Sequence, residues 1–239
     1  MHLSHDKEYI HHLNPRISSR VRETVFGMED GLVSTMGAIT GIAAATRDPF
    51  IVLLSGFVIV AVESVSMGVG SYLSSKSEKE VKLNKIREEK QELKDYPQSE
   101  EDELYALYVE SGWSEELAKK MVKEASKKPA LFLNEMAFHE LKIIPDNLEA
   151  PLDNAVFMGI SYVIGGAVPL LPYLFLPVPI ALMLSVPFTM IGIFVLGVVT
   201  TKFTGRTWWK AGVEMFLLAS AAALVGYGVG RLADMVIPH

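Results

Sequence analysis

Two stretches, GMEDGLVSTMGAITGIAAAT (27–46) and VIVAVESVSMGVGSYL (58–73), decide the fold of this chain. Each is apolar enough for lipid, yet the first contains Asp30 and the second contains Met67. A charge at membrane depth costs about 2.5–3.5 kcal/mol on insertion scales, so an intramembrane carboxylate indicates a functional site. A thioether is a soft metal ligand, and the pair therefore points to a divalent transition metal.

The charges of the chain are gathered in one segment. Of its 28 acidic and 22 basic residues, 14 and 12 lie between Lys76 and Lys128, and half of all residues are hydrophobic. This segregation predicts a membrane protein with one aqueous insert. The absence of cysteine excludes disulfides and thiolate metal sites. No basic patch with interleaved aromatics is present, so nucleic acid is not an expected partner.

Five apolar segments predict five transmembrane helices in an all-α, polytopic membrane protein. Each is near the roughly 20 residues that cross a bilayer core. The expected ranges are about 23–46, 50–73, 154–173, 178–200 and 208–235. The turn before Pro49 separates the first two, because proline disfavours helix at the preceding residue. Gly37 and Gly41 are expected to allow close helix contacts, either within the chain or in a dimer.

The chain is accordingly divided into 1–75, 76–150 and 151–239, of which the middle part is a helical, metal-binding insert. Its start is expected to continue the second span as a helix, with opposite charges such as Glu78 and Lys82 four residues apart. Ser99 and Ser114 are expected helix N-caps, because acidic residues follow each of them.

Basic residues set the expected orientation. They are frequent in the N-terminal arm, in the insert and in the loop before the last span, whereas the opposite loops offer only Arg47. By the positive-inside rule, the N-terminus and the insert face the cytosol. The polar N-terminal arm lacks the apolar core of a cleaved signal peptide, and none is expected.

The second span adds a carboxylate to the opening pair. Glu63 lies near the middle of that span and shares a helical face with Met67, four residues on. Glu63 is a candidate proton carrier or a partner for a buried polar group. The plainer alternatives are an interfacial cap for Asp30 and core packing for Met67.

The insert contains three further pairs of potential ligands, each on one helical face. The pairs are Glu89 and Glu92, Glu100 and Glu103, and Met136 and Glu140. Carboxylates with a thioether favour Fe²⁺ or a neighbouring divalent ion. The alternative is an ordinary solvated helix face. The Glu135–His139 spacing does not match the Glu-x-x-His pairs of di-iron bundles.

These residues resemble those of the vacuolar iron transporter family. The likeness rests on DGLVSTMGAITGIAAAT (30–46), ESVSMGVGSYLSSKSEKE (63–80), the glutamate-rich insert and GGAVPLLPY (165–173). It implies a homodimeric secondary transporter, not an enzyme, that moves Fe²⁺, Mn²⁺ and related ions such as Zn²⁺ and Co²⁺ out of the cytosol in exchange for protons. The membrane would be the plasma membrane in a prokaryote and the vacuolar membrane in a eukaryote. The alternative function is a membrane-anchored metal-binding or sensing protein without flux.

The family's pathway residues fall on Asp30 and Met67, and its insert ligands fall on the six residues of the three pairs. One position departs from the family pattern, which commonly reads SMxxGEY. The glutamate of that pattern is Ser71 here, which puts in doubt a metal hand-off at the cytosolic mouth. Glu63 or Glu78 could compensate for it.

Overall fold

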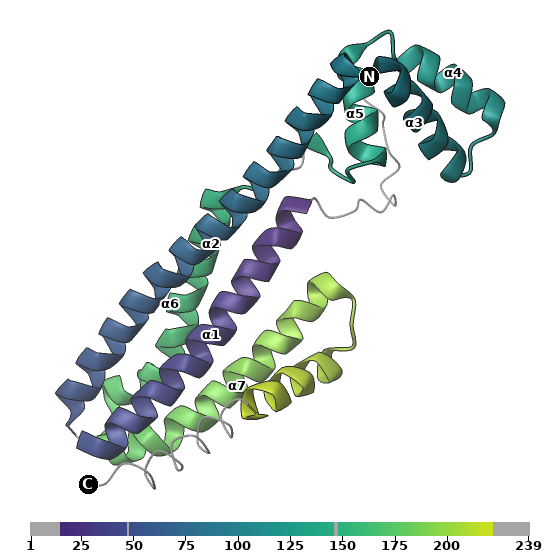
Figure 1. The fold of residues 1–239 in the computed structure, drawn as a ribbon. Coiled ribbons are helices and arrows are strands. Elements are labelled where there is room, and N and C mark those ends of the chain that lie inside the picture. Colours follow the sequence, from purple (N-terminus) through teal and green to yellow (C-terminus); the bar gives the residue numbers. More distant parts are fainter. Residues whose placement is uncertain (1–14, 47, 146–147, 222–239) are drawn as a thin grey trace, which may run out of the picture. The chain divides into compact units, whose positions relative to one another are not determined.

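The computed structural model describes residues 15–46, 48–145 and 148–221, and this part of the chain is helical without a strand (Figure 1). The helices are α1 (Pro15–Thr46), α2 (Pro49–Asp95), α3 (Pro97–Glu110), α4 (Glu115–Ala125), α5 (Pro129–His139), α6 (Pro151–Phe175) and α7 (Val178–Thr204). A further helix begins at residue 208 and is described as far as residue 221. The expected all-α class is confirmed.

The chain forms two compact units. Unit 1 comprises residues 1–72 and 151–239, and unit 2 comprises residues 73–150. The helix α2 runs through the boundary between them, so the charged stretch after Leu73 continues the apolar stretch before it without a break.

Three helices of the described residues are long and apolar enough to cross a membrane: α2, α6 and α7. The helix α1 does not reach that hydropathy, because Glu29, Asp30 and many small residues offset its aliphatic ones. The last expected span, 208–235, is described only in part. Pro169 and Pro187 lie inside α6 and α7, which continue through them.

Unit 1 is built on close contact between α1 and α6. Gly27 and Gly31 face the carbonyl oxygens of Met158 and Tyr162, and a Cβ on Gly31 would lie 2.4 Å from the latter. Gly37 and Gly41 have no neighbour within 4 Å of such a Cβ among the described residues, so no close contact of these two glycines is seen in this part of the chain. The glycines that permit the described packing are Gly31 and Gly27, about two and three turns before Gly37.

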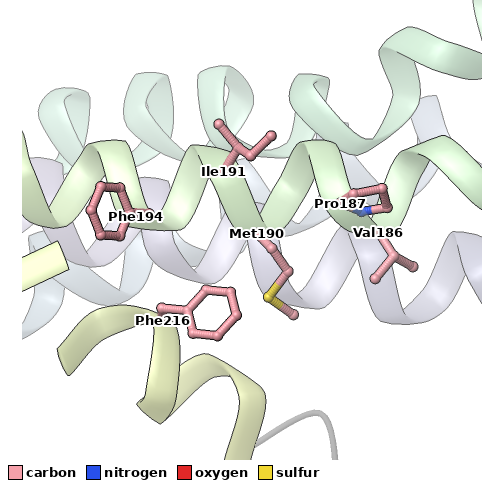
Figure 2. Close-up of a pocket in the computed structure, with 6 residues that line it drawn as sticks. All are labelled: Val186, Pro187, Met190, Ile191, Phe194 and Phe216. Carbon is pink, nitrogen blue, oxygen red and sulfur yellow. The ribbon is translucent and has the colours of Figure 1, made fainter. Parts of the chain in front are cut away.

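Buried aliphatic side chains fill the rest of unit 1. One cluster joins α1, α2, α6 and α7 around Ile39, Val60, Leu170 and Ala181. An apolar groove lies between α7 and the helix that begins at residue 208, and Figure 2 shows Met190 and Phe216 facing each other across it. The groove carries no charged side chain and is suited to lipid or apolar packing, not to an ion.

Unit 2 is a small helical domain with its own core. The helices α3, α4 and α5 pack around Leu104, Tyr108, Phe132 and Met136. Lys82 lies 2.7 Å from Glu78, so the expected i,i+4 pair is present.

Two predicted caps in unit 2 have different outcomes. Ser114 is the N-cap of α4 and accepts a hydrogen bond from the Leu117 amide at 3.4 Å, as expected. Ser99 is not an N-cap: α3 begins at Pro97, with Tyr96 in the capping position. The fixed φ of proline and its missing N–H suit the first position of a helix, which explains the earlier start.

The α1–α6 packing predicts that Gly165 does not tolerate a side chain. A Cβ there would lie 2.3 Å from the Met28 carbonyl oxygen, a backbone atom that cannot rotate away. We expect Gly165→Ala to destabilise unit 1 by about 1–3 kcal/mol, as overpacking usually does. Gly70→Ala, which meets nothing within 4 Å, is the matched control. Thermal unfolding in detergent compares them, and equal melting temperatures would contradict the packing described.

Candidate metal sites

Three glutamates of unit 2 converge although they come from different helices. Glu89 of α2, Glu100 of α3 and Glu140 at the end of α5 each place a carboxylate oxygen within 4.8 Å of the others. Glu89 and Glu100 are only 2% and 7% exposed, so the oxygens meet below the surface. We call these three residues the glutamate cluster.

Two of the other three predicted ligands of the insert lie close to the glutamate cluster. The charges of Glu92 and Glu103 act on Glu100, which places both carboxylates close to it. Met136 is fully buried in the hydrophobic core of unit 2, one turn before Glu140 on α5. The structure thus brings three predicted ligands together and places two more, Glu92 and Glu103, within reach of their charges, whereas Met136 belongs to the hydrophobic core.

Crowding of like charges alters the acidity of the glutamate cluster. Burial, a hydrogen bond with Glu140 and the charges of Glu140, Glu100 and Glu92 raise the pKa of Glu89 to about 8. Burial and neighbouring carboxylates also raise the pKa of Glu100 and of Glu103. At neutral pH the cluster therefore retains a proton when no cation is bound.

The glutamate cluster has the properties of a cation site. The Oε1 atom of Glu89 is buried and has no hydrogen-bond partner among the described residues, an arrangement that is costly unless something else satisfies the oxygen. For a small divalent ion with metal–oxygen distances near 2.1 Å, opposite ligands lie about 4 Å apart. The observed spread of 4.8 Å is slightly wider, so a modest side-chain rotation would close the three carboxylates on one ion.

A polar network that the sequence analysis did not identify joins α3 to α5 beside Glu140. The Tyr108 hydroxyl donates to Glu135 Oε2 at 2.9 Å, and His139 Nε2 lies 3.6 Å from the same oxygen. The Tyr108 and His139 rings are in edge contact at 5.0 Å. The i,i+4 spacing of Glu135 and His139 was the one available signal.

A second polar site lies in unit 1, within helices that are otherwise apolar. Asp30 of α1 is half-buried, Glu63 of α2 is exposed in the protomer, and their charges lie close enough to act on each other. Met67 is half-buried one turn after Glu63. Tyr162 of α6 completes the site: its hydroxyl lies 2.6 Å from Ser34 Oγ, which donates to the Asp30 carbonyl oxygen at 2.7 Å.

Another polar group in unit 1 contains Ser71, the position at which the sequence differs from the family pattern. Its hydroxyl donates to Glu23 Oε2 at 2.7 Å. Glu23 lies on α1 and is 5% exposed, and Arg22 donates to its other oxygen at 2.9 and 3.0 Å. The carboxylate that contacts Ser71 is thus Glu23, which sequence reasoning did not consider. Its spacing of seven residues before Asp30 was the available signal.

The fold and these sites define a helical membrane protein with several buried or half-buried carboxylates. The chain belongs to the VIT family, whose family model matches residues 21–231. "Vacuolar iron transporter 1" of Eucalyptus grandis is 30% identical over 212 residues, covering 88% of this chain and 85% of the relative. "Vacuolar iron transporter 1" of Tulipa gesneriana is 27% identical over 217 residues, covering 90% and 88%. "Protein CCC1" of Saccharomyces cerevisiae is 28% identical over 220 residues, covering 88% and 67%.

The resemblance seen in the sequence is confirmed, and the chain is grouped with transporters, not with enzymes.

The raised pKa of Glu89 predicts pH-dependent metal binding by the glutamate cluster. Because the folded pKa, about 8, lies above the ordinary value of 4.5, the proton on Glu89 must leave before the oxygen can bind a metal. We expect the affinity for Mn²⁺ to rise with pH from about 6 to about 8 and then to level off, with proton release on binding. Calorimetry of the full chain in buffers of different ionisation enthalpy measures both quantities.

The raised pKa of Glu89 also makes the stability of the metal-free protein depend on pH. A raised carboxyl pKa contributes stability below pH 4.5 that is lost as the pH rises through about 8. Glu89→Gln should weaken the pH dependence of metal binding together with most of the affinity, whereas Glu124→Gln on the exposed face of α4 should change neither. Affinity that is constant with pH in the unaltered chain would contradict the assignment.

Proposed function

We propose that this chain is a secondary transporter that carries Fe²⁺ out of the cytosol in exchange for protons. Mn²⁺ and related ions such as Zn²⁺ and Co²⁺ are further candidate cargo. The observation that carries the proposal is the presence of two carboxylate sites on one chain, one in the polar unit 2 and one within the apolar helices of unit 1. The relatives named as vacuolar iron transporters support iron as the principal ion.

In this proposal, the glutamate cluster captures the ion. Its carboxylates are hard oxygen ligands, and Met136 is a softer ligand one turn from Glu140. Glu92 and Glu103 add negative charge that attracts a cation before it binds. The protons held on the cluster would leave as the metal arrives, so capture weakens in acid.

Asp30, Glu63 and Met67 form the proposed transport pathway in unit 1. Two carboxylates whose charges act on each other are unfavourable in a membrane unless a cation or a proton lies between them. A metal ion and protons would therefore occupy Asp30 and Glu63 in turn, which couples the two fluxes. Met67 would favour transition metals over Mg²⁺ and Ca²⁺.

The exposed apolar surface of α1 and α2 in the protomer supports a homodimer. The apolar stretch of α2 that contains Glu63 is only 22% buried, and a charge facing lipid there is costly. On α1, Gly37 and Gly41 meet no neighbour among the described residues, and they lie on the same helical face as Asp30, seven and eleven residues after it. Small residues four apart allow close helix pairing in membranes. A second copy on this surface would cover Glu63 and place the pathway between the subunits.

The proposed topology has five spans, with the N-terminus and unit 2 in the cytosol. The basic residues near Arg20 and Arg22 and the lysines of unit 2 support this orientation. The membrane is the plasma membrane in a prokaryotic cell or the vacuolar membrane in a eukaryotic one, in line with the names of the relatives.

The proposal predicts that Asp30→Asn abolishes transport without abolishing capture. The amide keeps the size of the side chain but cannot balance a cation, so we expect uptake of radioactive manganese into acid-loaded proteoliposomes to fall to the protein-free level. Binding by the glutamate cluster should remain. Asp48→Asn is the matched control, because Asp48 lies in the turn before α2 and asparagine also caps helices.

Transport by Asp30→Asn at the unaltered rate would exclude Asp30 from the pathway. An unaltered chain that binds Mn²⁺ but shows no uptake would favour the metal-binding or sensing alternative.

A further inference from the structure

Glu23 is a buried carboxylate in unit 1 that belongs to neither of the two sites assigned above. Its side chain is held from two directions, by the Ser71 hydroxyl at 2.7 Å and by two N–H groups of Arg22 at 2.9 and 3.0 Å. A buried carboxylate without a positive partner is strongly unfavourable. Arg22 is therefore the counter-ion of Glu23 in the state described.

Glu23 and Ser71 lie beyond Asp30 and Met67, toward the same end of the α1–α2 pair. Seven residues nearly complete two helical turns, so Glu23 and Asp30 lie on one face of α1, about 10 Å apart along the axis. Ser71 follows Met67 by about one turn on α2. Since α1 and α2 are joined by a short turn, they run antiparallel, and both steps lead to the end of the pair at which α2 continues into unit 2.

The two partners of this ion pair differ in exposure. The Arg22 side chain is 63% exposed, whereas that of Glu23 is 7% exposed. Arg22 can turn into solvent when another cation takes its place beside Glu23, because the guanidinium side is already largely exposed. Glu23 stays in place, held by Ser71, whose oxygen also has lone pairs for a cation. This asymmetry suits the exchange of one cation for another at a fixed carboxylate.

We propose that Glu23, positioned by Ser71, is an additional binding step for the divalent cation, at which the cation replaces Arg22 before it reaches Asp30. The step rests on the proposed function and adds a residue to it. The proposal also explains why Ser71 can stand where the family pattern has a glutamate. The carboxylate at this position of the α1–α2 pair is Glu23 of α1, which Ser71 of α2 contacts.

A binding experiment tests the exchange directly and does not depend on transport. The full chain carrying Glu89→Gln, Glu100→Gln and Glu140→Gln removes the glutamate cluster, and Mn²⁺ is titrated into it by calorimetry in detergent. Adding Glu23→Gln should weaken the remaining binding by about tenfold or more, the usual effect of losing a supporting group. Adding Arg22→Gln should strengthen it, because the competing guanidinium is gone.

A structural ion pair would give a different pattern, in which Arg22→Gln weakens binding or leaves it unchanged. Either of those results, or unchanged binding with Glu23→Gln, would overturn the proposal. Glu124→Gln breaks the exposed pair with Lys127 and controls for loss of an ion pair as such.

Transport then tests whether the carboxylate is needed at this level. We expect Glu23→Gln to raise the Mn²⁺ concentration needed for half-maximal uptake by about tenfold. Adding Ser71→Glu to Glu23→Gln should reverse much of that effect, because it places a carboxylate on α2 at the position that contacts Glu23. A double variant that runs as a single species on gel filtration but regains nothing would overturn the proposal. Absence of uptake in the unaltered chain would refute the proposed function instead, and the binding comparison would still decide the role of Glu23.

Discussion

A carboxylate removed from water needs a proton or a cation beside it, and this requirement shapes each polar site of the protein. Glu89 meets it with a proton, since its pKa is raised to about 8. Glu23 meets it with the Arg22 guanidinium. Asp30 and Glu63 lie within reach of each other's charge, where a shared cation would satisfy both. Sites that cannot stay empty of positive charge are suited to exchanging one positive species for another.

Backbone packing determines where these carboxylates lie. Gly31, directly after Asp30, fits against the Tyr162 carbonyl oxygen, and Gly165 fits against that of Met28. At these glycines the two backbones leave no room for a side chain, which fixes the position of Asp30 along the helix axis relative to Tyr162. The hydroxyl of Tyr162 then bonds to Ser34, one turn from Asp30. A metal pathway requires such fixed placement, because ligands that shift by an ångström lose much of their affinity.

Much of the fold could be predicted from the sequence because its strongest signals are local. Hydropathy and proline positions located α6 and α7 to within a few residues, and the charge pattern placed the continuation of α2. The cap at Ser114 follows from adjacent residues, and so does the failure at Ser99, where Pro97 starts the helix earlier. For α1, the small and acidic residues that suggest function also lower its hydropathy, so the signal for a span is weakest there.

The candidate sites could be predicted from the sequence only where potential metal ligands lie close together along the chain. Glutamates at helical spacing indicated the cluster, but the convergence of Glu89 with Glu100 and Glu140 depends on how α3 and α5 fold against α2. The contact between Glu23 and Ser71 could not be predicted from the sequence, because the two residues are 48 positions apart and meet only through the packing of α1 against α2. Tyr162 was missed for the same reason.

In the proposed function, metal and protons move in opposite directions through one chain. Its most direct test uses proteoliposomes that contain a pH-sensitive dye and have equal pH on both sides at the start. On addition of external Mn²⁺, we expect the lumen to become alkaline in step with metal uptake, because protons leave as the metal enters. Uptake with an unchanged lumenal pH, at a membrane potential clamped by ionophore, would contradict it.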